Sequence, residues 1–188
     1  MKTKSIKIFV SNLDIFVLIA FYNEKNNIYL KQVNFFKKES DVNKFLKQAK
    51  RELIDNVSAS KEIIQMEKLI KSYFEGKNVN LYKELQKIGI KISLISIFPT
   101  KFSQDVIKTL LNYYFGDLTS YFEIGKKLNS KAYRAIGNVL KSNPIPLIIP
   151  CHRVIKKNGK IGGFMGKQDE SWQVSLKKNL LNLEGHHF

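Results

Sequence analysis

Cysteine is almost absent from this chain of 188 residues, and Cys151 is the only one. A single thiol excludes a disulfide framework and fits a reducing compartment. It also argues against structural zinc, because His186 and His187 have no second thiol or nearby acidic ligand to complete a site. We therefore expect a chain that uses neither a disulfide nor a metal.

Long apolar runs are missing as well. The best candidate, residues 15–22, is too short to cross a bilayer, and no small-residue cleavage site follows it as in a signal peptide. The sequence therefore predicts a soluble intracellular protein without membrane attachment, which would be cytoplasmic, or nuclear if the source is a eukaryote.

Acidic residues are scarce relative to basic ones. The chain has 16 Asp and Glu against 32 Lys and Arg, so its net charge is +16. The excess divides equally between residues 1–100 and 101–188. Such a charge favours polyanionic partners, nucleic acid first, although a lysine-rich proteome would explain much of it. Arginine is rare by comparison, and Arg134 and Arg153 fall close to the unusual segment described next.

Proline is also sparse, and three of the four prolines gather in residues 143–156 together with the cysteine. They are Pro144, Pro146 and Pro150. Proline lacks a backbone donor and biases the preceding residue toward extended geometry, so we predict a stiff, extended loop rather than an ordinary central strand.

The same segment places Cys151 beside His152 and Arg153. Neighbouring positive charge stabilises a thiolate, as a reactive nucleophile requires. A lone cysteine next to Leu-Ile-Ile is, however, commonly a small buried hydrophobe. On spacing alone the two interpretations are equally favoured.

The first half of the chain predicts strands followed by helices. Strands are expected at Ser5–Val10, Ile15–Tyr22 and Ile28–Phe36. Helical spacing then joins Val42 to Leu53 and Ile63 to Phe74, with Gly76 as a helix-terminating residue. Residues 81–99 are predicted to be a connection with an extended apolar piece at Ile88–Phe98, and the domain boundary lies near residue 99.

The second half is predicted to be mostly helical. The apolar residues Val106, Ile107, Leu110, Leu111 and Tyr114 have the spacing of one helix face. Two short helices at about Ser120–Leu128 and Ala132–Lys141, joined by Asn129-Ser130-Lys131, form a helix-turn-helix pattern. A plain helical hairpin with a solvated face is an equally good interpretation of this pattern alone.

The second of these helices has features suited to DNA. The small residues Ala135 and Gly137 leave a low surface that a nucleic-acid backbone could approach. Polar and basic side chains stand at its start and along its length: Arg134, Asn138 and Lys141. These five residues are our candidates for DNA contacts.

Two glycine-containing segments follow the cysteine. Asn158-Gly159 suits a type I′ turn, and residues 161–166 form a glycine-rich stretch whose amides could meet a ligand. The stretch lacks the pattern of a nucleotide-triphosphate loop. A last amphipathic helix from about Trp172 ends before Glu184.

The run from Arg134 to Val154, R-A-I-G-N-V-L-K-S-N-P-I-P-L-I-I-P-C-H-R-V, resembles the O6-alkylguanine-DNA alkyltransferase family at nearly every position. The resemblance extends over about residues 99–188, through Ser120–Ile124, Gly162-Gly163-Phe164 and Leu183-Glu184-Gly185-His186. It implies an α+β chain with two domains. These would be an RNase H-like strand-and-helix domain at 1–98 and a helical, DNA-binding and alkyl-accepting domain with the helix-turn-helix at 99–188.

The resemblance also implies a chemistry. Cys151 would accept the alkyl group from O6-alkylguanine in duplex DNA, irreversibly and once per molecule, with no cofactor. His152, acting through a water and oriented by Glu184, would maintain the thiolate. Asn143 would brace the turn before the cysteine, and Tyr121 would press on the target phosphate and donate a proton to the leaving guanine.

Further roles concern the DNA. Arg134 would replace the flipped nucleotide in the stack, while Ala135 and Gly137 would let the helix enter the minor groove. The backbone at Cys151 and Val154 would accept from the guanine amino group, and the Met165 amide would meet O6.

Some residues depart from the family pattern. Phe164 replaces a common tyrosine, Met165 a smaller residue and Ser103 a frequent glutamine, and residues 166–172 form a longer segment than usual. The range of alkyl groups is therefore left open. Two other functions are kept as alternatives: a non-catalytic binder of alkylguanine, and a helix-turn-helix regulator. We expect a monomer.

Overall fold

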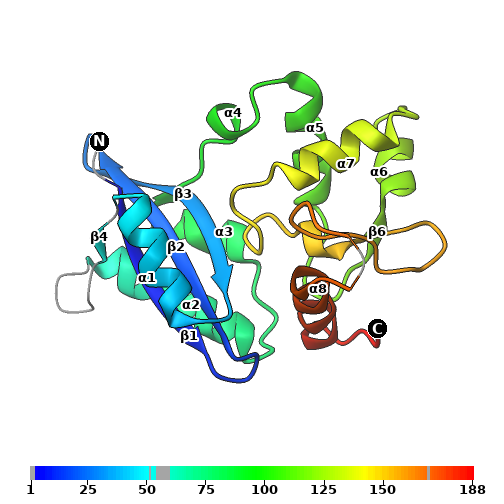
Figure 1. The fold of residues 1–188 in the computed structure, drawn as a ribbon. Coiled ribbons are helices and arrows are strands. Elements are labelled where there is room, and N and C mark those ends of the chain that lie inside the picture. The colour runs from blue at the N-terminus through cyan, green and yellow to red at the C-terminus, as the bar shows by residue number, and fades with distance from the viewer. Residues whose placement is uncertain (1–2, 51, 54–59, 169) are drawn as a thin grey trace. The chain divides into compact units, whose positions relative to one another are not determined.

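The computed structural model describes residues 3–50, 52–53, 60–168 and 170–188. The chain divides into two compact units, residues 1–93 and 94–188 (Figure 1). The first contains β1 (Lys4–Val10), β2 (Ile15–Glu24), β3 (Asn27–Phe36), α1 (Glu39–Gln48), β4 (Glu52–Leu53), α2 (Lys61–Phe74), α3 (Leu81–Lys87) and β5 (Ile90–Lys91). The second contains α4 (Leu94–Ile97), α5 (Lys101–Leu110), β6 (Thr119–Ser120), α6 (Tyr121–Lys127), α7 (Tyr133–Lys141), a 3-10 turn (Cys151–Arg153), β7 (Val154–Ile155) and α8 (Trp172–Leu183).

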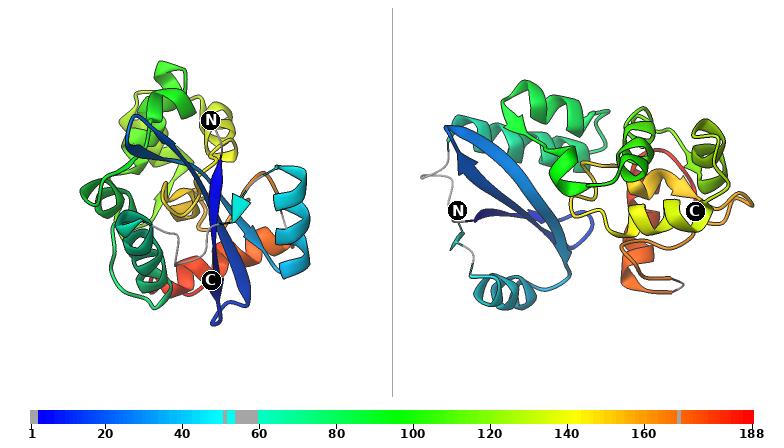
Figure 2. Two further views of the ribbon diagram at one scale, coloured as in Figure 1. Left: turned by 90° about the vertical axis from the view of Figure 1, so that its left-hand side faces the viewer. Right: turned by 90° about the horizontal axis from the view of Figure 1, so that it is seen from above.

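The first unit is a five-stranded sheet in the order β4-β1-β2-β3-β5. Strands β1, β2 and β3 form an antiparallel meander, and the short β4 and β5 add parallel pairs at its two edges. Helix α1 covers one face, where Val42 and Leu46 pack on Leu18, and α2 and α3 lie on the other (Figure 2). Both faces of β2 are therefore buried, which explains why the apolar run from Ile15 to Phe21 does not alternate with polar residues.

The three predicted strands are confirmed, and so is the end of α2. Gly76 has φ of 79° and follows the last turn of the helix. Its amide donates to the Tyr73 carbonyl, and the Lys77 amide donates to the Ser72 carbonyl. This pair of bonds is the Schellman arrangement, which requires a left-handed residue that glycine adopts without strain.

Two predictions for the first unit are wrong. Leu53 does not continue the face of α1, because that helix ends at Gln48 and Leu53 pairs with Ser5 in the edge strand β4. The segment Ile88–Phe98 is not one extended piece. Asn80 caps a helix before it, only Ile90–Lys91 pair with β3, and Leu94–Ile97 form a helical turn. Short apolar runs do not distinguish strand from helix by periodicity, so pairing decided these positions.

The second unit confirms the helix-turn-helix. Ser120 caps α6 by accepting from the Glu123 amide, and a short turn leads to α7. Gly125 permits the close approach of the two helices, because a Cβ atom there would lie 2.6 Å from both the Ser130 carbonyl and the Tyr133 ring. Helix α5 begins with a capping box between Thr100 and Ser103, which gives Ser103 a structural role.

Helix α5 ends earlier than its pattern predicted, so Tyr114 lies in the loop beyond it. The Asn158-Gly159 turn is also not of type I′. Of its two central residues only Gly159 has a positive φ. The Gly159 amide donates to the Lys156 carbonyl, and the Lys156 amide donates to the Lys160 carbonyl. A type I′ turn has two central residues, and both need a positive φ. Here the bond from Lys156 to Lys160 closes a longer loop, so a positive φ at Gly159 alone is enough.

Candidate active site

The loop between α7 and the 3-10 turn is compact and buried from Ile145 to Pro150. Its centre is a turn in which Leu147 has φ of 77° and the Ile149 amide donates to the Ile145 carbonyl at 3.0 Å. The predicted extended geometry is therefore wrong for this centre. Proline restricts its own φ and the residue before it, and Leu147 and Ile148 are in neither position, so they were free to turn and bury their side chains.

Asn143 ties this loop to the cysteine. Its side-chain oxygen accepts from the Ile145 amide at 3.1 Å, and its Nδ2 donates to the Ile149 carbonyl at 3.1 Å. The same Nδ2 lies 3.3 Å from Sγ of Cys151. One amide side chain thus holds both ends of the turn and contacts the sulfur.

Cys151 is buried and opens the 3-10 turn that continues into β7. Burial raises the pKa of its thiol, while the hydrogen bond from Asn143 and the positive charge of Lys177 act in the opposite direction. The thiol is therefore protonated at rest, and a base must take its proton before it can act as a nucleophile.

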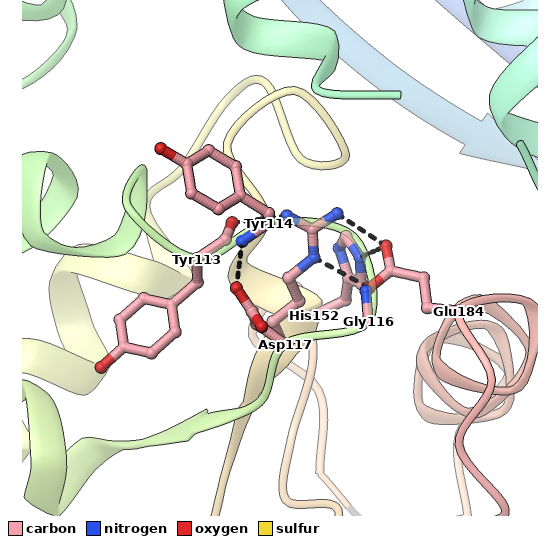
Figure 3. Close-up of polar contacts among 7 residues, drawn as sticks. Tyr113, Tyr114, Gly116, Asp117, His152 and Glu184 are labelled. Atoms are coloured by element: carbon pink, nitrogen blue, oxygen red, sulfur yellow. Dashed lines mark hydrogen bonds and ion pairs between the residues drawn. The ribbon is translucent and has the colours of Figure 1, made fainter. Parts of the chain in front are cut away.

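The neighbouring His152 is completely buried and contacts Glu184, with 2.9 Å between Nε2 and Oε1 (Figure 3). Burial lowers the pKa of the imidazole against the opposing effect of the carboxylate, so the ring is neutral. Because Glu184 can only accept, Nε2 carries the ring hydrogen and Nδ1 is the basic nitrogen.

Glu184 is positioned by the end of α8. It is the last residue before Gly185, whose φ of 92° lets the chain leave the helix while the His186 amide donates to the Leu181 carbonyl. The spacing Glu-Gly-His therefore has a local reason, since only a left-handed residue after Glu184 ends the helix there.

Arg153 is the main partner of Glu184. Its Nε and Nη2 each donate to one carboxylate oxygen at 2.8 Å, and Nη1 donates to the Tyr113 carbonyl at 2.7 Å. The Gly116 amide adds a longer contact of 3.4 Å to the carboxylate. Burial alone would raise the pKa of Glu184, but the hydrogen bonds from His152 and Arg153 outweigh it and hold the pKa far below its usual range.

The sequence analysis took Arg153 as positive charge beside the thiol and did not pair it with Glu184, although an arginine in an apolar segment signals a buried acidic partner. The planar guanidinium of Arg153 makes one hydrogen bond to each oxygen of the Glu184 carboxylate. The second lone pair of Oε1 is left to accept from His152. The buried charge of Glu184 is thereby neutralised in the folded chain before any reaction begins.

A pocket of about 750 Å³ opens above Cys151. Its lining includes Tyr121 from α6 and Arg134, Gly137, Asn138 and Lys141 from α7. The opposite wall comes from the glycine-rich segment, Ile161–Gln168. Of the candidate DNA-contact residues, only Ala135 does not line it. The structure thus brings the predicted nucleophile and the predicted DNA-reading helix to one cavity.

Tyr121 reaches this cavity because α6 starts where β6 ends, and β6 pairs with β7 directly after the 3-10 turn. Burial raises the pKa of its hydroxyl, and the nearby Cys151 raises it further. The phenol is therefore protonated and can act as a proton donor.

The far wall ends in a hairpin from Phe164 to Lys167, which exchange two backbone hydrogen bonds of 2.9 Å. Its central residues Met165 and Gly166 have φ of 50° and 77°. A methionine in this left-handed conformation is strained, and such strain is retained mainly at functional sites. Of the longer segment that follows, residues 166–172, the structure describes all but residue 169.

Lys177 is a buried charged residue to which the sequence analysis gave no role. It lies on α8, is completely buried, and donates to the Val154 carbonyl at 2.6 Å. The signal was present, because Lys177 stands within the apolar arc that contains Leu176 and Leu180. A lysine in such an arc is seldom buried unless its ammonium has partners.

Among the residues that the structure describes, no group of three or more His, Cys, Asp or Glu side chains could hold a metal ion. No helix of this described part is long and apolar enough to cross a membrane.

Sequence comparison finds a family match within the second unit. Residues 101–186 match the family described as 6-O-methylguanine DNA methyltransferase, DNA binding domain. Methylated-DNA--protein-cysteine methyltransferases are similar, with 34% identity over 116 residues for Methanocaldococcus vulcanius and 40% over 113 for Saccharolobus islandicus. These alignments cover 62% and 60% of this chain, and 63% of each relative.

Structural comparison extends the likeness to the whole fold. The O6-methylguanine methyltransferase of Mycobacterium tuberculosis has a TM-score of 0.63 at 23% identity, covering 97% of this chain and 92% of its own. That of Pyrococcus kodakaraensis has a TM-score of 0.63 at 20% identity, covering 98% and 99%. A Mycobacterium tuberculosis structure in complex with DNA has a TM-score of 0.60 at 22% identity, covering 98% and 92%. At these identities the comparison establishes the fold, which confirms the α+β class.

Proposed function

We propose that this chain repairs O6-alkylguanine in duplex DNA by moving the alkyl group to Cys151, because residues 101–186 match the family described as 6-O-methylguanine DNA methyltransferase, DNA binding domain. The observation that carries this proposal is the pocket in which the buried thiol and the helix-turn-helix residue Arg134 line the same cavity. A thiol in a pocket that opens on a DNA-reading helix is placed to act on a base, not on the DNA backbone.

The proposed reaction begins with the thiol proton. Nδ1 of His152 takes it through a water, while the Nε2 hydrogen bond to Glu184 stabilises the imidazolium that forms. The thiolate then attacks the alkyl carbon. A carbon–sulfur bond forms, the bond from that carbon to guanine O6 breaks, and its electron pair leaves with the base.

Tyr121 is the proposed proton donor to the departing guanine. The hydroxyl is protonated, and its side chain lines the pocket with Cys151. Protonation makes guanine a less basic leaving group, and His152 can afterwards return a proton to the phenolate. The thioether product is stable, so each chain reacts once and needs no cofactor.

The target base must leave the helix to reach the sulfur. We propose that α7 lies in the minor groove, where Gly137 and Ala135 permit close approach, and that Arg134 takes the place of the extruded nucleotide. Asn138 and Lys141 are exposed on the same helix and are proposed to contact the DNA backbone. The Met165 amide and the carbonyls of Cys151 and Val154 are proposed to hold the flipped base, although Val154 already accepts one bond from Lys177.

Duplex DNA with a labelled O6-methylguanine tests this function. We expect one label per chain, found on the peptide that contains Cys151, and no further transfer when DNA is in excess. A binder of alkylguanine would hold the DNA without acquiring label, and a regulator would bind unmodified DNA equally well. Either result, or repeated turnover, would contradict the proposal. We also propose that the chain acts as a monomer, which size-exclusion chromatography of the protein with the same DNA tests.

The Arg134→Ala variant tests base flipping. We expect it to slow transfer from duplex DNA by about 10²-fold, the effect typical of losing a positioning contact, while its reaction with free O6-benzylguanine changes little. The free base needs no extrusion, and Arg134 is exposed at the pocket edge. Lys108→Ala on α5 removes the same charge from an exposed position and serves as the control. Equal losses on the two substrates would show that Arg134 has no role in flipping.

A further inference from the structure

The ammonium of Lys177 joins β7 to the glycine-rich wall of the pocket. It donates to the Val154 carbonyl at 2.6 Å on one side, and to the carbonyls of Ile161 at 2.7 Å and Gly163 at 3.3 Å on the other. An ammonium has three hydrogens, so these three carbonyls satisfy it fully. Taking a lysine out of water is costly, and a hydrocarbon side chain would fill the same volume without that cost.

Gly162 makes this arrangement possible. Its φ of 72° turns the chain so that the carbonyls on either side of it converge on one nitrogen. A Cβ atom at Gly162 would lie 3.4 Å from the Lys156 side chain and 4.0 Å from the Lys177 nitrogen. The left-handed turn at Gly162 is therefore the backbone counterpart of the buried lysine.

The backbone of Gly163 packs against the hairpin Phe164–Lys167 that follows it. A Cβ atom at Gly163 would lie 2.6 Å from the Lys167 carbonyl, so the two backbones are in direct contact. The hairpin Phe164–Lys167 carries Met165, whose amide is proposed to meet guanine O6. A shift of the Gly163 carbonyl would therefore move the substrate-facing amide relative to the sulfur.

We propose that Lys177 is a positioning residue for alkyl transfer. Its ammonium holds the wall Ile161–Gly163, and the hairpin that follows, against β7, the strand directly after Cys151–Arg153. The inference rests on the proposed function and adds a residue to it. Lys177 acts through the backbone and through its charge, without touching the substrate.

The charge of Lys177 has a second effect, on the thiol. Burial lowers the pKa of the Lys177 ammonium to about 8, with Cys151 opposing and Lys156 adding to the decrease. In return, the ammonium favours the Cys151 thiolate and disfavours protonation of His152. These are the titratable groups that face it from the 3-10 turn and from the loop after β7. Loss of the ammonium should raise the pKa of the Cys151 thiol.

The test compares Lys177→Met with Lys178→Met, which removes an exposed lysine from the next position of α8. We expect Lys177→Met to slow transfer from methylated duplex by about 10²-fold, the effect of a small misplacement at a reacting centre, and Lys178→Met to leave the rate unchanged. Alkylation of Cys151 by iodoacetamide at neutral pH, where the Lys177 ammonium is still charged, should be slower in Lys177→Met only. A folded Lys177→Met variant with the transfer rate and the alkylation rate of the unmodified protein would overturn the proposal.

Gly162→Ala covers the case in which Lys177→Met does not fold. It keeps the ammonium but strains the turn that brings the two carbonyls together. Slower transfer with an unchanged alkylation rate at neutral pH is expected, and an unchanged transfer rate would overturn the positioning role. If the unmodified protein failed to transfer label from DNA, the proposed function would fall, whereas the iodoacetamide rates would still report the effect of Lys177 on the thiol.

Discussion

Replacement of Cys151 by serine is expected to abolish alkyl transfer, a loss on the order of 10⁶-fold, as is typical when a catalytic nucleophile is removed. A hydroxyl is far less acidic than a thiol, so neutral His152 cannot generate an alkoxide in its place. The fold should persist, because the hydroxyl is of similar size and can still accept the Asn143 hydrogen bond now made to sulfur. DNA binding should persist too, since the residues of α7 are unchanged.

The measurement is label transfer from methylated duplex together with a gel-shift titration on the same DNA. Ser142→Ala, an exposed position at the end of α7, is the matched control and should transfer label normally. Label bound covalently to the Cys151→Ser protein would mean that another side chain accepts the alkyl group, and the assignment of Cys151 would then be wrong.

Exchange of Glu184 for glutamine is expected to lower the free energy of unfolding by about 3–5 kcal/mol, the usual result of breaking a buried ion pair. The amide keeps the shape but leaves the Arg153 guanidinium buried without its opposite charge. Transfer should slow as well, because the imidazolium of His152 loses the carboxylate that stabilises it.

This stability term has a definite pH dependence. The pKa of Glu184 is depressed by folding, so its contribution is complete above the pKa of an unfolded glutamate, about 4.3, and is lost as the pH falls below it. Urea unfolding at neutral and at acidic pH should therefore show a large difference between the unmodified protein and Glu184→Gln that shrinks in acid. Glu170→Gln, at an exposed position, is the control. A constant difference at all pH values would show that the charge of Glu184 is not its source.

Prediction from sequence succeeded where the cause is local. Strands β1 to β3 and helices α2, α6, α7 and α8 follow from apolar spacing and from residues that begin or end them, such as Ser120 and Gly76. It failed where pairing at a distance decides. Ile90 is a strand residue only because Ile28 lies beside it, and Leu53 only because Ser5 does.

The candidate site divides in the same way. The motif around Cys151 and Asn143 could be recognised because its parts are adjacent in the chain, and the left-handed residue after Glu184 explains why that carboxylate recurs at a helix end. The turn at Leu147 was not predictable, since no local rule asks a leucine to adopt positive φ. The bonds that close the turn, between Ile149 and Ile145 and between Asn143 and both, are seen only in the folded chain.

The sequence by itself therefore predicted the candidate nucleophile, the helix proposed to face DNA and the spacing between them, because these depend on side-chain chemistry within one continuous segment. Only the tertiary structure decided how the buried charges are satisfied. Arg153 reaches Glu184 across 31 positions, and Lys177 reaches the carbonyls of Val154 and Gly163 across 23 and 14. A buried charge takes as its partner whatever group the fold places beside it, and that group need not be near in sequence.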